Sequence, residues 1–85
     1  MANMNLENEI FETGETYYTL VVYDIEHKQW FNEFGDYDKQ CVAEEMDEYI
    51  YGYHDIKPKN IKILKTTDNQ KDIDAAITKL NGVAA

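Results

Sequence analysis

Few residues in this chain have the type and spacing that catalysis or metal binding requires. Catalysis needs paired carboxylates in a pocket, a nucleophile beside a base, or a cluster of metal ligands. The two histidines, His27 and His54, fall in segments expected to be a hairpin turn and a loop, and neither has neighbours that form a recognised ligand set. We therefore expect both to be exposed polar residues, and we predict that the protein is not an enzyme.

The other candidates for chemistry have structural explanations. Cys41 falls on the apolar stripe of a predicted helix, which favours an inert core residue. The run Asp36, Tyr37, Asp38 is too short for a calcium loop, which needs further oxygen ligands and a glycine turn. The glycines are isolated, so the sequence contains no phosphate-binding loop. We expect neither a cofactor nor a metal ion.

Charge is unevenly distributed along the 85 residues. Residues 1–55 hold 14 of the 17 acidic residues and two of the eight lysines, a net charge of −12, whereas residues 56–85 carry +3. One-sided negative charge of this size repels nucleic acid and membrane surfaces and attracts basic protein surfaces. The chain also lacks arginine, the preferred residue for recognising phosphate and guanine. We expect a protein partner with a basic surface, and direct contact with neither nucleic acid nor membrane.

Composition indicates one small folded domain. Hydrophobic residues make up 44% of the chain and aromatic residues 13%, which is too much for a disordered acidic tail. Residues 1–14 form an acidic N-terminal arm in which a short helix could form, and residues 15–85 are expected to fold as a single α+β domain. One cysteine, no apolar leader and no long apolar run predict a cytoplasmic location.

Three segments are predicted to be strands. Residues 15–26 are rich in β-branched and aromatic side chains and are apolar on both faces, so this strand should lie at the centre of its sheet. After a polar turn, the alternation over residues 29–34 predicts a second strand with Trp30 and Phe34 on one face. Residues 60–66 form the third strand.

Two segments are predicted to be helices. Asp36 should cap a helix over residues 37–51, which ends at Gly52 in a left-handed conformation. Thr67 begins a capping box for the last helix, which should end at Gly82.

The resulting order, β-β-α-β-α, predicts a three-stranded antiparallel sheet in the order 2-1-3. Both helices are expected to cover one face of this sheet. The other face of the apolar central strand would then need cover from the N-terminal arm or from a second copy of the chain. A homodimer is therefore compatible with the sequence.

Acidic residues gather at the start of the predicted 37–51 helix and along it, over about 20 Å of helix rise. They are Asp36, Asp38, Glu44, Glu45, Asp47 and Glu48. Two explanations remain open: a solvated helix face, or a binding surface. The excess of charge over the magnitude of about 2–8 that keeps a small domain soluble favours binding.

Tyrosines and lysines also allow two explanations each. The seven tyrosines either fill both faces of the sheet or contribute to an interface, where tyrosine is enriched, and Tyr51 should be exposed. The lysines at positions 57, 59, 62 and 65 indicate a charged edge strand that discourages aggregation, or a surface that pairs with the acidic face of a second copy.

The chain resembles small acidic phage-encoded anti-defence proteins, which include anti-CRISPR and anti-restriction inhibitors. The resemblance rests on the run YYTLVVYD at residues 17–24, on Trp30 followed by EFGDYD at residues 33–38, and on the acidic helix after them. It implies a decoy whose carboxylates resemble phosphates and occupy the DNA-binding cleft of a nuclease or CRISPR effector. The positive C-terminal third departs from a uniformly acidic mimic and implies a one-sided decoy.

We therefore predict a non-enzymatic inhibitor that occupies the basic nucleic-acid-binding surface of a bacterial defence protein. Its predicted partner-binding residues are Asp36, Asp38, Glu44, Glu45, Asp47, Glu48 and Tyr51. The alternative is a cytoplasmic adaptor or regulatory module that docks through exposed tyrosines and an apolar sheet face. Its interface would centre on Tyr51, Phe31 or Trp30.

Overall fold

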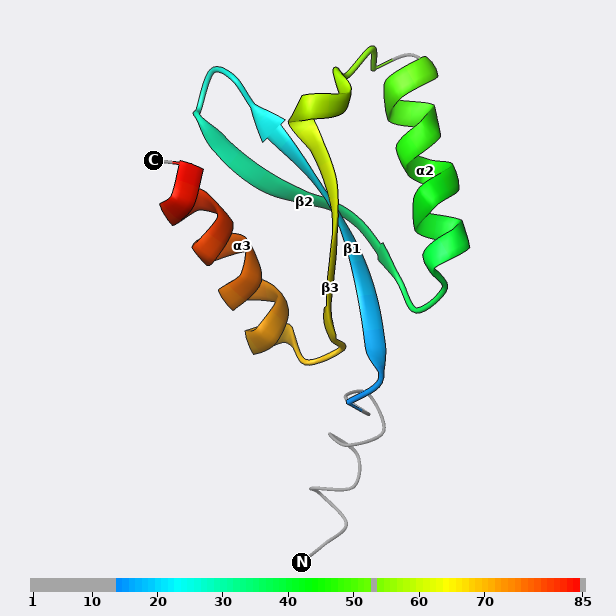
Figure 1. The fold of residues 1–85 in the computed structure, drawn as a ribbon, viewed down its shortest axis with the longest axis vertical. Helices are drawn as coiled ribbons and strands as arrows, with labels where there is room; N and C mark the ends of the chain where they lie inside the picture. Colours follow the sequence, from blue (N-terminus) through cyan, green and yellow to red (C-terminus); the bar gives the residue numbers. More distant parts are fainter. Residues whose placement is uncertain (1–13, 53, 85) are drawn as a thin grey trace, which may run out of the picture.

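The structure, a computed structural model, describes residues 14–52 and 54–84. Its elements in chain order are β1 (Thr16–Asp24), β2 (Gln29–Asp36), α2 (Lys39–Tyr51), the 3₁₀ turn η1 (Pro58–Asn60), β3 (Ile61–Thr67) and α3 (Gln70–Ala84). The strands form one antiparallel sheet in the order β2-β1-β3 (Figure 1). The predicted α+β class, element order and strand order are confirmed. The predicted N-terminal helix lies outside the described residues.

Strand β1 is buried on both of its faces. Leu20 and Val21, which point to opposite faces of the sheet, both have 0% exposure. Leu20 stands opposite Phe34 of β2 and Ile63 of β3, so β1 is the middle strand of the ladder. The central, doubly apolar strand predicted from residue types is therefore confirmed.

The two helices cover opposite faces of the sheet (Figure 1), so the prediction that both cover one face is wrong. Val42 of α2 packs with Leu20 in a buried cluster on one side. Helix α3 lies on the other side, the side of Val21, where Asn81 accepts a hydrogen bond of 2.7 Å from the Trp30 amide. Because β1 is apolar on both faces, one helix on each face removes both from water.

A β-bulge in β2 changes the face to which its side chains point. The pairing of β1 with β2 shifts between Leu20 and Val21, which leaves Glu33 outside the ladder. Phe34, on one side of the shift, packs with the α2 cluster. Trp30, on the other side, is buried beneath α3. The prediction that Phe34 and Trp30 share a face is wrong because it assumed strict alternation.

Both helices begin at caps other than the predicted ones. Asp38, not Asp36, is the N-cap of α2, and its carboxylate accepts from the Gln40 amide at 2.9 Å. Asp36 instead accepts from the Asp38 amide at 2.8 Å and shapes the turn before the helix. At α3, the Asn69 side chain accepts from the Lys71 amide in the first turn at 2.8 Å, whereas Thr67 accepts from the Asn69 amide before the helix at 3.2 Å.

The helix ends also differ from prediction. Gly52 closes α2 with a φ of −97°, outside the left-handed region, and its N–H donates to the Glu48 carbonyl at 2.8 Å. Helix α3 does not stop at Gly82 but runs on to Ala84. Neither helix in the described part of the chain is long and apolar enough to cross a bilayer.

Asp68 ties three segments together at the end of the sheet away from the hairpin turn. Its buried carboxylate accepts hydrogen bonds from the Gly14 amide at 2.8 Å and from the Tyr37 hydroxyl at 2.9 Å. The Tyr37 ring packs edge-on against Tyr17, with ring centroids 4.9 Å apart. Tyr17 in turn lies over Gly35, where an added Cβ would sit 2.5 Å from the Tyr17 hydroxyl. Glycine at this position therefore lets the aromatic pair close over β2.

Candidate functional site

The outward face of α2 carries the predicted acidic surface. Glu44, Asp47, Glu48 and Tyr51 follow one another three or four residues apart or as immediate neighbours, so they share one side of the helix. All are exposed, and Tyr51, at the C-terminal end, is 82% exposed. We call these four residues the acidic stripe. The structure thus brings together this subset of the predicted partner-binding residues.

The acids of the stripe have no lysine to neutralise them. The ion pair in the described part of the chain joins His27 and Asp24, and none there involves the acids of α2. Glu44 and Glu48 are four residues apart, a spacing at which like charges repel. Glu48 also lies in the last turn, beside the negative end of the helix dipole, and Asp47 directly precedes that turn. Each of these features opposes the stability of the helix.

The other predicted acids stand apart from the stripe. The carboxylates of Asp36 and Asp38 bind backbone amides at the start of α2, which gives them a structural role. Glu45 is half-buried on the flank of α2, where its charge contributes to the raised pKa of Tyr49. These three residues add to the negative charge around α2 but are not part of the acidic stripe.

Cys41 is exposed, so the expectation of a core residue is wrong. The core side of α2 is set by Val42, and a step of one residue turns about 100° around a helix. The thiol Sγ lies 3.7 Å from the Asp38 carboxylate. Partial desolvation, and then the charges of Asp38 and Asp36, raise the pKa of Cys41.

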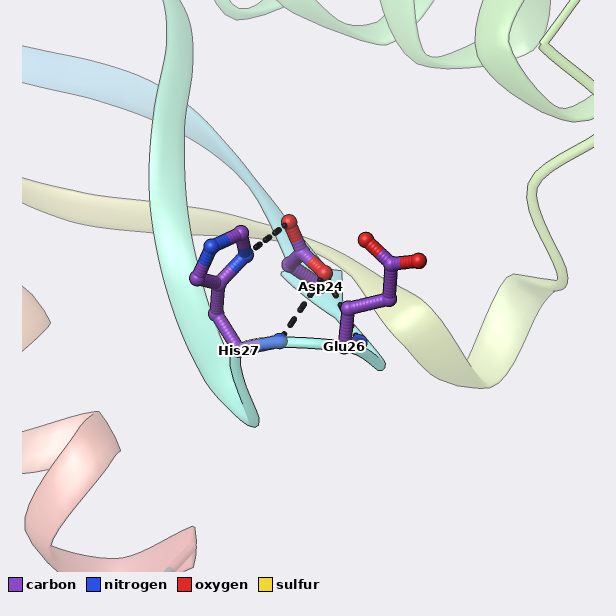
Figure 2. A group of neighbouring side chains, drawn as sticks. All are labelled: Asp24, Glu26 and His27. Atoms are coloured by element: carbon purple, nitrogen blue, oxygen red, sulfur yellow. Dashed lines mark hydrogen bonds and ion pairs between the residues drawn. The ribbon is translucent and has the colours of Figure 1, made fainter.

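Asp24, Glu26 and His27 form a polar cluster in the hairpin turn between β1 and β2 (Figure 2). His27 Nδ1 lies 2.9 Å from Asp24 Oδ2, while Asp24 Oδ1 accepts from the amides of Glu26 and His27 at 2.9 and 3.2 Å. The side-chain hydrogen bond with His27 is the largest cause that lowers the pKa of Asp24. One ligand atom from each residue lies within 4.8 Å of the others, a spacing that could hold a cation.

Sequence reasoning identified the exposed turn at His27 but not its pairing with Asp24. All three residues stand within the run DIEHK, so an aspartate three positions before the histidine was the available signal. Such an aspartate often binds the amides that follow it in a turn. The cluster therefore has a structural role in the hairpin.

His54 is exposed, as predicted, but it packs against a second aromatic ring. It stacks on Tyr49 with ring centroids 4.2 Å apart and an interplanar angle of 12°. The Tyr49 hydroxyl donates to Glu33 at 3.2 Å. Desolvation, and then the charge of Glu33, raise the pKa of Tyr49. This chain of contacts joins the C-terminal end of α2 to the bulge of β2.

An open groove of about 480 Å³ lies beside this contact, between the hairpin and the segment before β3. We call it the hairpin groove. Four carboxylates line it, from Asp24, Glu26, Glu33 and Asp55, against one lysine, Lys57. Its apolar lining consists of Val22, Tyr23, Ile25, Phe31 and Ile56. Sequence analysis missed the groove because its two walls are far apart along the chain.

Lysines gather on other elements than α2. Two lie in or next to η1, at positions 57 and 59, and two in β3, at positions 62 and 65. Lys62 places its Nζ 5.2 Å from the centre of the Trp30 ring, a cation–π contact that covers a buried indole. The charge split along the sequence is therefore also a separation between elements.

Comparison of the chain with protein-family profiles, with curated proteins and with solved structures finds no match.

Proposed function

We propose that this protein is a non-enzymatic acidic inhibitor that occupies the basic nucleic-acid-binding surface of a partner protein. The observation that carries the proposal is the acidic stripe of α2. Its acids are exposed and form no ion pair within the described residues, and Glu48 lies in the last turn, where the helix dipole disfavours it. An arrangement that opposes the stability of its own helix favours a role for these charges in binding.

The charge spacing of α2 supports competition with nucleic acid. Helix α2 has 13 residues and is therefore about 20 Å long. One DNA strand places about six phosphates over the same distance. The helix, the loop before it and the last residue of β2 carry six acids against Lys39. A cleft that binds one nucleic acid strand would meet a similar number of negative charges on α2.

Resemblance to phage anti-defence proteins supports a bacterial nuclease or CRISPR effector as the partner. The proposed decoy is one-sided, because the lysines of η1 and β3 would be repelled by the same basic cleft. Binding should therefore take place through the α2 side alone.

The test is capture of partners from bacterial lysate by the immobilised full chain, at low and at high salt. A Glu44→Lys/Glu48→Lys variant reverses the net charge of the stripe. An Asp72→Lys/Asp74→Lys variant makes the same change of net charge on α3 and serves as the matched control. The proposal expects nucleic-acid-binding proteins on the wild type and the control at low salt, and their loss at high salt and on the stripe variant. Capture that survives both salt and charge reversal in the stripe would contradict it.

The alternative, an adaptor that docks through apolar and aromatic side chains, is favoured by the exposure of two aromatic residues. Tyr51 is 82% exposed and Phe31 39%, whereas Trp30 is 7% exposed and therefore unsuited to docking. In that case Tyr51→Ala or Phe31→Ala would abolish capture. The stripe variant would then have no effect.

A further inference from the structure

We propose that the hairpin groove binds a basic segment of a partner protein, in which lysine or arginine side chains alternate with apolar ones. This goes beyond the proposed function because the groove is a second surface, separate from the acidic stripe. Either surface could bind its target if the other did not.

The apolar part of the groove lies at the hairpin end of the sheet, where apolar side chains stay exposed. At the hairpin end, Phe31 lies opposite Val22 on the α2 side of the sheet and stays 39% exposed. Ile25, in the turn, is 69% exposed. An apolar side chain that entered here would remove both from water.

The charged residues around these apolar side chains favour a cationic ligand. Glu26 and Asp55 are exposed and form no ion pair within the described residues. Figure 2 shows the Glu26 carboxylate directed away from the His27 ring, which pairs with Asp24 instead. Glu33 is held in place by the Tyr49 hydroxyl at 3.2 Å. Lys57 is the one positive side chain in the lining, so the groove keeps an excess of negative charge.

The same charges argue against other occupants. Phosphate groups of nucleic acid or lipid would meet four carboxylates and be repelled. A purely apolar ligand would leave Glu26 and Asp55 without an ion-pair partner among the described residues. A peptide with alternating basic and apolar side chains satisfies both parts of the groove, because successive side chains of an extended chain point to opposite sides.

The experiment titrates the nitrogen-15-labelled full chain with the synthetic peptide GKLKFKG and follows backbone amide shifts by NMR. Two control peptides separate the contributions: GKGKGKG keeps the charge without apolar side chains, and GELEFEG reverses the charge. Phe31→Ala removes the apolar floor. Glu26→Gln/Asp55→Asn removes charge, with asparagine chosen because Asp55 has a φ of 51°, which asparagine tolerates. Glu44→Gln/Glu48→Gln makes the same change of net charge in the acidic stripe.

We expect GKLKFKG to shift the amides of Ile25, Phe31 and Ile56, and the two controls to bind more weakly. Both groove variants should weaken binding about tenfold, the effect of losing one buried apolar side chain or one charged contact. The stripe variant should bind as the wild type does. The proposal is overturned if GKLKFKG does not bind, if GKGKGKG binds equally well, or if the shifts gather on α2. It is also overturned if the stripe variant loses as much affinity as the groove variants.

Discussion

At the scale of single residues, the carboxylates of this protein divide into two kinds. Asp38 and Asp68 accept hydrogen bonds from backbone amides, and Asp24 does so in the hairpin turn. Glu48 and Asp47, by contrast, are exposed and form no ion pair within the described residues. The first kind shapes the fold. The second kind is free to act on a partner.

The contact between Tyr37 and Asp68 should make the stability of the fold depend on alkaline pH. The hydrogen bond to Asp68, followed by desolvation, raises the pKa of Tyr37 above its ordinary value. Below pH about 10, the tyrosine is neutral in both the folded and the unfolded chain, and its contribution to stability is fully present. As the pH rises further, the unfolded chain releases the proton first, so this contribution is lost.

Absorbance at 295 nm measures the ionisation of Tyr37 directly when the wild type and Tyr37→Phe are titrated side by side. The difference between the two curves should show a tyrosine that ionises above the ordinary range. The urea midpoint of the wild type should fall with rising pH more steeply than that of Tyr37→Phe. A difference curve centred on the ordinary value would mean that the hydrogen bond to Asp68 is not formed.

Cys41 reports on the electrostatic potential at the start of α2. Its thiol is exposed beside Asp38, and its pKa is raised. Because the thiolate is the reactive form, Cys41 should react slowly at neutral pH and faster as the pH rises. An anionic disulfide reagent should react more slowly than a neutral one, and added salt should reduce the difference. Equal rates with both reagents at low salt would show that the surface near Cys41 is not strongly negative.

At the scale of elements, residue patterns predicted which segments are strands and helices better than where each begins and how they pack. The run of apolar residues in β1 indicated a central strand buried on both faces, and the structure confirms it. The two apolar faces of β1 also indicate where α3 lies, because the second apolar face needs a second element to shield it from water. The sequence suggested the N-terminal arm or a second copy of the chain for that role, and the structure uses the last helix instead.

Irregular backbone features account for other differences. The bulge at Glu33 cannot be recognised from alternation alone, and it moves Phe34 to the α2 side. The cap of α2 is Asp38 and not the predicted Asp36. Both aspartates accept from the amide two residues later, so residue type alone does not show which of them begins the helix. Of the candidate sites, the acidic stripe could be predicted from its helical spacing. The hairpin groove could not, because it depends on tertiary contacts.

Helix α2 should become more stable when the stripe loses charge. Glu48→Lys removes the repulsion with Glu44 and places a positive charge at the negative end of the helix dipole. We expect the free energy of unfolding to rise by about 0.5–1 kcal/mol. Urea denaturation followed by far-UV circular dichroism measures it, with Glu48→Gln expected to lie between the variant and the wild type. A loss of stability would show that Glu48 has a structural role, and would weaken the case for binding.

At the scale of the whole molecule, the charge split along the chain becomes a difference between the elements of a small sheet protein. Helix α2 lies on one side, and α3 on the other (Figure 1). The negative charge of residues 1–55 includes the acids of α2, whereas the net positive charge of residues 56–85 comes from the lysines of β3 and those in and next to η1, because α3 carries two lysines and two aspartates. This polarity should orient the protein as it approaches a basic surface, with α2 leading.

The proposed function requires α2 and nucleic acid to compete for the same surface of the partner. The direct measurement is the affinity of this protein for a captured partner as duplex or single-stranded DNA is added, with Glu44→Lys/Glu48→Lys as the comparison. We expect mutual exclusion: DNA displaces the wild type, and the protein displaces DNA, with both affinities falling steeply as salt rises. A stable ternary complex, with the protein and DNA bound to the partner together, would contradict it.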